Sequence, residues 1–213
     1  MTGKFVTLEG CEGVGKSTQL AKLKEYLQKR GIDAVFTREP GGTALSEQIR
    51  DIILNKFNTE MDAVTELLLY EAARRQHTVQ FIAGRLKAGQ IVICDRYADS
   101  SVAYQGFARG LGADIVKKLN ALAMGDVKID LTLFLDLPPE KAFLRKGGRD
   151  EDDRLENEKM AFHKKVYEGF LSIAAEESRR FVRIDASGDK DKTHAEIVRV
   201  LTQRGIIPSE EKY

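Results

Sequence analysis

The 213-residue sequence has few cysteines, few prolines and no excess of charge of either sign. Its 34 lysines and arginines nearly cancel 33 aspartates and glutamates. The resulting net charge of +1 argues against a protein that mainly coats DNA or an anionic membrane, because both need a standing positive field. No apolar run approaches the ~20 residues of a membrane helix.

The two cysteines, Cys11 and Cys94, do not have the spacing of a zinc or redox site. Thiols that need no partner suit a reducing compartment. Residues 1–5 also lack the long apolar stretch of a signal peptide, so we expect a cytoplasmic protein. Hydrophobic residues make up 42% of the chain, which excludes a disordered protein and allows one domain, residues 1–213, with a substantial core.

Five short apolar runs bounded by turn residues predict buried strands. They lie at residues 5–8, 34–37, 91–94, 131–135 and 181–184. Helical patterns lie between them, from residue 16 to a cap at Gly31 and near 44–55, 62–87, 112–124, 139–146, 156–178 and 190–204. This alternation predicts an α/β fold in three layers, with a five-stranded, mostly parallel sheet between helices. Ligands of such sheets bind at the carboxyl ends of the strands.

The loop after the first predicted strand matches the phosphate-loop pattern G-x-x-x-x-G-K-[ST] at every fixed position. We expect its backbone N–H groups and the following helix N-terminus to hold the phosphates of a nucleoside triphosphate. Lys16 is expected to reach the β- and γ-phosphates, and Ser17 to ligate Mg²⁺. The expected nucleotide-binding residues are Gly10, Cys11, Glu12, Gly13, Val14, Gly15, Lys16, Ser17 and Thr18.

Two other nucleotide-binding classes do not fit the sequence. The glycine spacing differs from the dinucleotide pattern G-x-G-x-x-G. A GTPase needs the pattern N-K-x-D, and the nearest string, residues 55–58, lacks the aspartate. The compact domain with charged loops at several strand ends indicates a small kinase.

Lys16 could also favour a reactive thiolate at Cys11 in the phosphate loop. The favoured interpretation of Cys11, however, is a small residue that is tolerated at a variable position.

The loop after residues 91–94 begins with Asp95 and Arg96. Asp95 is expected to hold Mg²⁺ directly or through water, with a helix N-cap as an equally weighted alternative. Arg96 suits the phosphate of an acceptor substrate. On the helix near 62–87, Tyr70 and Arg74 share a face that could bind a base. Taken alone, however, this pair is better interpreted as part of a surface helix, on which the aliphatic stem of Arg74 packs.

Residues 145–156 are rich in glycine and charge and predict a lid. Arg149 and Arg154 in this segment could neutralise the transferring phosphoryl group, whereas composition alone favours a solvated loop. His77, His163 and His194 form no catalytic pattern, and each is interpreted as a surface or packing residue. No general base is needed, because an acceptor phosphate is already an anion near neutral pH.

Three strings together resemble the bacterial thymidylate kinase family over nearly the whole chain. They are L-E-G-C-E-G-V-G-K-S-T (8–18), T-R-E-P-G-G (37–42) and D-R-Y-x-x-S-S-x-A-Y-Q-G (95–106), with residues 149–156 in support. The resemblance implies a fold of the phosphate-loop NTPase type and Mg²⁺-dependent transfer of phosphate from ATP to dTMP. It also implies a homodimer.

The resemblance further implies roles for individual residues. It implies that Tyr70 stacks on thymine, that Arg74 donates to its O4 edge, and that Ser101 and Gln105 contact its other edge. It also implies that Tyr104 crowds the 2′ position of the sugar and that Glu12 meets the 3′-hydroxyl. Arg96 and Arg50 are implied to hold the acceptor phosphate, and Glu39 and Asp95 to lie near the metal. One branch of the family has an arginine where this chain has Gly13, so the resemblance indicates the branch whose lid supplies Arg149 and Arg154. Another small nucleotide or nucleoside kinase, or a non-catalytic nucleotide-binding subunit, remains as an alternative.

Overall fold

The five apolar runs form one sheet in the computed structural model, which describes residues 3–146, 154–155 and 158–209. The strands are β1 (Lys4–Glu9), β2 (Ala34–Arg38), β3 (Ile91–Asp95), β4 (Leu131–Asp136) and β5 (Phe181–Asp185). They lie in the order β2-β3-β1-β4-β5, and every pairing is parallel. Each strand continues one residue past its predicted carboxyl end, and that residue is charged in all five. The parallel α/β sheet is confirmed, with a charged edge where the strands end.

Helices connect the strands close to their predicted bounds. They are α1 (Lys16–Lys29), α2 (Ala44–Leu54), α3 (Ala63–His77), α4 (Ala83–Lys87), α5 (Ala98–Ser101), α6 (Ala113–Met124), α7 (Pro139–Lys146), α8 (Met160–Glu176) and α9 (Lys190–Gln203). A π-helical turn, η1 (Thr78–Ile82), joins α3 to α4 and makes the long helix predicted over 62–87 continuous. No helix in the described ranges is long and apolar enough to cross a membrane.

One helical segment was not predicted. Residues 98–108, expected as a loop, form α5 and a π-helical turn, η2 (Val102–Ala108). All residues from Ser101 to Gly106 are buried. A helix that is buried on every side lacks the alternation of apolar and polar faces from which helices are recognised.

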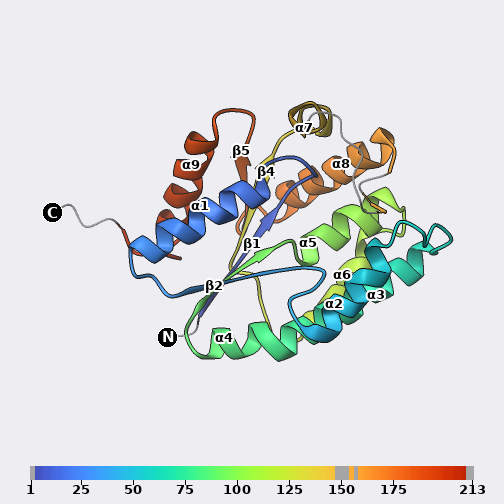
Figure 1. Ribbon diagram of the computed structural model, residues 1–213, viewed down its shortest axis with the longest axis horizontal. Helices are drawn as coiled ribbons and strands as arrows, with labels where there is room; N and C mark the ends of the chain where they lie inside the picture. Colours follow the sequence, from blue (N-terminus) through green and yellow to red (C-terminus); the bar gives the residue numbers. More distant parts are fainter. Residues whose placement is uncertain (1–2, 147–153, 156–157, 210–213) are drawn as a thin grey trace.

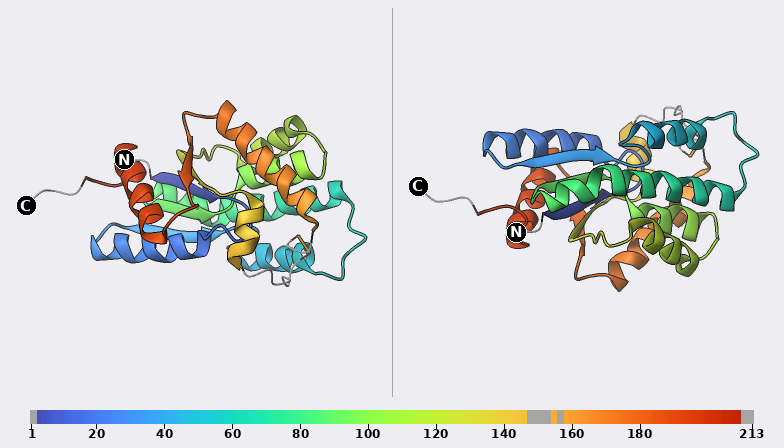
Figure 2. Two further views of the ribbon diagram at one scale, coloured as in Figure 1. Left: turned by 90° about the horizontal axis from the view of Figure 1, so that it is seen from above. Right: turned by 90° about the horizontal axis from the view of Figure 1, so that it is seen from below.

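The sheet lies between two layers of helices, as Figures 1 and 2 show. Helices α1 and α9 pack against each other on one face, while α4, α6 and α8 lie on the other. Phe134 of β4 stacks on Phe170 of α8 with their ring centroids 5.1 Å apart. On the same face, Phe5 of β1 meets Tyr97, which follows β3, edge to face at 4.9 Å. These layers hold the strand ends and the loops after them in fixed positions.

Candidate active site

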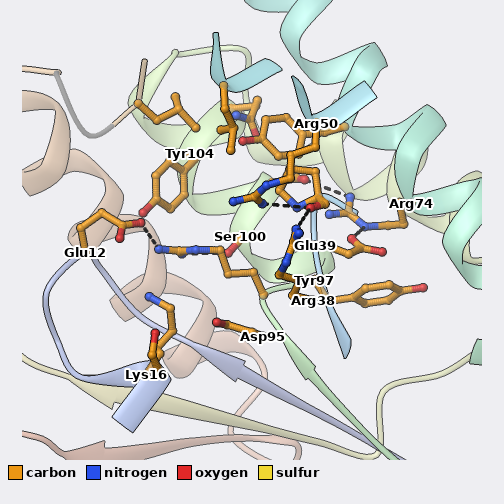
Figure 3. A pocket seen from close by; sticks show the side chains of 18 of the residues that line it. Glu12, Lys16, Arg38, Glu39, Arg50, Arg74, Asp95, Tyr97, Ser100 and Tyr104 are labelled. Atoms are coloured by element: carbon orange, nitrogen blue, oxygen red, sulfur yellow. Dashed lines mark hydrogen bonds and ion pairs between the residues drawn. The ribbon is translucent and has the colours of Figure 1, made fainter. Parts of the chain in front are cut away.

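A cavity of about 420 Å³ opens at the carboxyl edge of the sheet. It joins the loop after β1 to the loops after β2 and β3 and to helices α2, α3 and α5 (Figure 3). Many of the residues proposed from the sequence line it together: Glu12, Gly13, Gly15, Lys16, Ser17, Thr18, Glu39, Arg50, Tyr70, Arg74, Asp95, Arg96, Ser101, Tyr104 and Gln105. One end of the cavity therefore carries the phosphate loop, and the other carries aromatic and polar groups from separate segments.

The phosphate loop takes its shape from glycines in backbone conformations that other residues rarely adopt. Gly13 has a φ of 73°, and a Cβ added there would lie 2.8 Å from the carbonyl oxygen of Ala142 in α7. A side chain at position 13 would thus need both an unfavourable φ and a displaced helix. This close approach gives a structural reason for glycine at the position where part of the family has arginine.

Lys16 is buried at the floor of the cavity (Figure 3). Its Nζ donates to the carbonyl oxygens of Gly10 and Cys11 at 3.2 and 3.1 Å. Burial, with a smaller effect of Arg96, lowers the pKa of Lys16. The ammonium is held within the loop that surrounds the phosphate position, where a bound phosphate would replace the carbonyl oxygens as its partner.

Burial makes the thiol of Cys11 unreactive. Its side chain is 2% exposed, and burial raises its pKa to about 12 even though Lys16 acts in the opposite direction. A thiolate is therefore not favoured near neutral pH. The interpretation of Cys11 as a tolerated small residue fits this structure, and its activation by Lys16 is not supported.

Asp95 ends β3 and lines the cavity close to the phosphate loop. Its Oδ1 atom is buried and has no hydrogen-bond partner within the part of the chain that the structure describes. A buried carboxylate oxygen without a partner is costly unless a ligand completes its coordination. Carboxylate and hydroxyl oxygens are the ligands that Mg²⁺ prefers, so Asp95 and Ser17 fit a magnesium site.

Arg96 follows directly and has a φ of 64°, the only positive value among the described residues other than glycine. Its guanidinium pairs with Glu12 and donates to the Gly10 carbonyl oxygen at 2.9 Å. The guanidinium carbon lies 5.2 Å from the centre of the Tyr104 ring. This unusual backbone conformation directs Arg96 back over the phosphate loop, between the two ends of the cavity.

The buried carboxyl of Glu9 anchors the turn that contains Arg96. Its Oε1 accepts from the Tyr97 backbone N–H at 2.8 Å, and its Oε2 accepts from the Ser100 hydroxyl at 2.5 Å. Ser100 also accepts from Arg96 at 3.3 Å. Burial and the charge of Asp99 raise the pKa of Glu9 to about 8, against the opposing hydrogen bonds. The sequence gives no signal of this role, because Glu9 reads as the polar end of a strand.

Arg74 is the largest side chain that the structure buries completely. Its Nε donates to Glu39 at 2.9 Å, while its Nη1 donates to Glu71, Ser101 and Asn120 at 2.6, 2.9 and 2.7 Å. Two buried carboxylates thus hold a permanent cation against the wall of the cavity. The surface-helix interpretation of Arg74 is wrong, because partners from other segments keep it inside.

Glu39 is itself held on two sides. Besides Arg74, it meets Nδ1 of His77 at 3.0 Å, and Nε2 of His77 lies 2.7 Å from the Thr37 hydroxyl. Of the two roles predicted for His77, surface or packing, its complete burial shows the packing role, and the residue also fixes Glu39. Next to Glu39, the Pro40 carbonyl oxygen accepts from Arg50 of α2 at 2.9 Å.

Glu66, at the start of α3, is a buried carboxylate that was not predicted from the sequence. It accepts from Gln105 at 2.7 Å, from Arg109 at 3.1 and 3.2 Å, and from Arg154 at 2.5 Å. Arg154 also donates to the Ile53 carbonyl oxygen at 3.1 Å. Its donors lie 39 to 88 residues away along the chain, so spacing could not reveal this cluster.

A few predicted site residues lie elsewhere. Arg154 points to Glu66 and is not among the described residues that line the cavity. Arg149, like most of the segment predicted as a lid, lies outside the described residues. Gly10, Cys11 and Val14 shape the phosphate loop from behind the cavity wall. Conversely, Tyr97, Ser100 and Leu155 line the cavity without having been proposed as site residues.

Comparisons with known proteins agree on one family. The family model described as "Thymidylate kinase" matches residues 8–197. A thymidylate kinase of Bacillus velezensis is 47% identical over 205 residues, covering 95% of this chain and 97% of the relative. One of Clostridium novyi is 47% identical over 197 residues, covering 92% and 96%. The crystal structure of thymidylate kinase from Ehrlichia chaffeensis superimposes with a TM-score of 0.77 at 35% identity, covering 95% of this chain and 99% of that one.

Proposed function

This chain belongs to the thymidylate kinase family, and we propose that the cavity described above is where it carries out the family's reaction. That reaction is the transfer of the γ-phosphoryl group of ATP to dTMP, which yields dTDP. One observation supports the site most strongly. The phosphate loop and the aromatic and polar groups from several other segments open into the same cavity, so both substrates can lie end to end.

The phosphate-loop end suits ATP. The backbone N–H groups of residues 10–18 and the N-terminus of α1 would hold its phosphates, with Lys16 on the β- and γ-phosphates. Ser17 and Asp95 would hold Mg²⁺, whose chemical contribution is to neutralise charge on these phosphates. The unpartnered buried oxygen of Asp95 supports this assignment.

The opposite end suits dTMP. Arg96 and Arg50 would hold its phosphate, while Glu12 would meet the 3′-hydroxyl once Arg96 turns to the phosphate. For the base, Tyr70 would stack on the thymine ring and Arg74 would donate to O4, with Ser101 and Gln105 on the side of N3 and O2. Tyr104 lines the cavity, and its buried ring would lie under the sugar and exclude a 2′-hydroxyl.

Catalysis in this arrangement is positioning and charge neutralisation. The acceptor phosphate is an anion and attacks in line, so no residue has to remove a proton from a hydroxyl group. His77 supports this view because both of its ring nitrogens already have partners, Glu39 and Thr37. Arg149 and Arg154 remain the candidates for stabilising the transferring group, and Arg154 would have to leave Glu66 to do so.

We further propose a homodimer and a cytoplasmic location. Helices α2, α3 and α6 pack side by side and carry half-exposed or exposed apolar side chains, namely Leu45, Ile52, Leu68, Ile115 and Leu122. An apolar surface that extends over several helices is typical of a subunit interface. The location rests on the two free, buried thiols, which suit a reducing compartment.

The experiment that tests this function measures ADP release from Mg-ATP with dTMP, dUMP, dCMP, dGMP, UMP and thymidine as acceptors. We expect fast turnover with dTMP, slower turnover with dUMP, and almost none with UMP or thymidine. UMP tests the sugar contact at Tyr104, and thymidine tests the need for an acceptor phosphate. ADP release that is equally fast with and without each acceptor would contradict the proposal.

A further inference from the structure

Glu66 is the most heavily hydrogen-bonded carboxylate near the base end of the cavity. It is fully buried, and its oxygens accept from Gln105, twice from Arg109, and from Arg154. Burial alone would raise its pKa, but the hydrogen bonds from Arg109 and Gln105 and the nearby arginine charges leave the pKa of Glu66 below its usual value. Glu66 is therefore an anion in the folded protein, and an anionic carboxylate only accepts hydrogen bonds.

This property fixes the orientation of the Gln105 amide. An amide presents an NH₂ donor on one branch and a carbonyl acceptor on the other. Because Glu66 can only accept, the NH₂ branch of Gln105 must face it, as the 2.7 Å bond from Nε2 shows. The carbonyl oxygen is then on the branch turned away from Glu66. Gln105 lines the cavity, so the group that it offers to a bound base is an acceptor.

Arg74, on the same wall, offers only donors. Its Nε and Nη1 are engaged by Glu39, Glu71, Ser101 and Asn120. Its Nη2 makes no hydrogen bond to a residue within the described ranges, and Arg74 lines the cavity. One donor and one acceptor therefore face the base from neighbouring positions.

This donor–acceptor pair distinguishes two classes of pyrimidine. A 4-oxopyrimidine such as thymine has an acceptor at O4 and a donor at N3, which complement Arg74 and the Gln105 carbonyl. A 4-aminopyrimidine such as cytosine has a donor at N4 and an acceptor at N3, so both contacts would be mismatched. Polar groups left unpaired in a buried site discriminate strongly between substrates.

We propose that Glu66 is a specificity-determining positioning residue, which holds the Gln105 amide in the orientation that rejects 4-aminopyrimidine nucleotides. Glu66 acts through Gln105 and does not touch the substrate. The inference rests on the proposed function, because it assumes that the base lies against Arg74 and Gln105. Arg109 and Arg154 contribute by keeping Glu66 charged and by fixing its two oxygens.

The test compares kcat/KM for dTMP and for dCMP in the wild type, Glu66→Gln and Glu66→Asp. A glutamine at position 66 can offer either a donor or an acceptor, which allows the Gln105 amide to reverse. Aspartate keeps the charge for Arg109 but is one methylene too short to reach Gln105, and so it provides a second variant if the first folds poorly. We expect the dCMP-to-dTMP ratio to rise at least tenfold in both variants.

A loss of correctly folded protein does not change the dCMP-to-dTMP ratio. Because kcat/KM for both acceptors is measured on the same preparation, the fraction of active enzyme cancels. Glu60→Gln, the same substitution at an exposed position of the α2–α3 connection, is the matched control and should keep the wild-type ratio. An unchanged ratio in Glu66→Gln and Glu66→Asp, with dTMP and dCMP turnover falling together, would overturn the inference. A wild type that does not phosphorylate dTMP would instead overturn the proposed function.

Discussion

The buried carboxyl of Glu9 predicts how the stability of this protein depends on pH. Its pKa is about 8 in the folded protein and about 4.5 in an exposed chain, because burial and Asp99 disfavour its charged form. Between these two values the folded state holds a proton that the unfolded state has lost. The free energy of unfolding must therefore fall as the pH rises from about 4.5 to about 8, and this contribution levels off above pH 8.

The magnitude follows from the separation of the two values. Each pH unit in that window costs up to about 1.4 kcal/mol, so the whole contribution is at most about 5 kcal/mol. Glu9→Gln removes the titration and keeps the shape of the side chain. The stability of the variant relative to the wild type should thus improve steadily between pH 5.5 and pH 8. Glu60→Gln, at an exposed site, should show no such trend.

Urea unfolding followed by circular dichroism at pH 5.5, 6.5, 7.5 and 8.5 gives the required free energies. We expect the wild-type advantage over Glu9→Gln to be largest at pH 5.5 and smallest at pH 8.5. A difference between the two proteins that stays constant over this range would refute the reasoning, because it would mean that Glu9 carries the same charge in the folded and the unfolded states.

Three further predictions concern other buried or charged groups. Arg74→Met should lower the free energy of unfolding by roughly 3–5 kcal/mol, because it leaves the buried carboxylates of Glu39 and Glu71 without their cation, and a loss below 1 kcal/mol in urea unfolding would contradict this. Cys11 should react with a disulfide reagent at pH 8 at least a hundredfold more slowly in the native protein than in urea, since burial raises its pKa to about 12, and equal rates would contradict its protection. Arg149→Ala and Arg154→Ala should lower kcat by at least tenfold in at least one case, and unchanged turnover in both would exclude the lid arginines from catalysis.

Local patterns in the sequence were sufficient for the sheet and for the phosphate loop. Short apolar runs predicted all five strands, and the glycine and lysine spacing predicted a phosphate loop that the structure forms between β1 and α1. Both features depend on residues that are close together in the chain. The buried helix at 98–108 has no amphipathic pattern, which is why it was expected as a loop.

The polar interior could not be predicted for a different reason. Glu66 meets Arg109 and Arg154 from 43 and 88 residues away, and Glu9 meets Ser100 from 91 residues away. In the sequence each of these carboxylates is a single charged residue, which is more often solvated than buried. Only the packing of the layers shows that these side chains lie inside, where Glu9 supports the turn of Arg96 and Glu66 supports the amide of Gln105.

The most direct test of the site is the fate of the γ-phosphoryl group of labelled ATP. With dTMP present, we expect the wild-type protein to place the label in dTDP, and without dTMP to release little labelled phosphate. Lys16→Met should reduce labelled dTDP at least a hundredfold while circular dichroism and dTMP binding stay close to those of the wild type. Label that appears mainly as inorganic phosphate whether or not dTMP is present, or undiminished dTDP formation by Lys16→Met, would contradict the assignment of this cavity as the site of phosphoryl transfer.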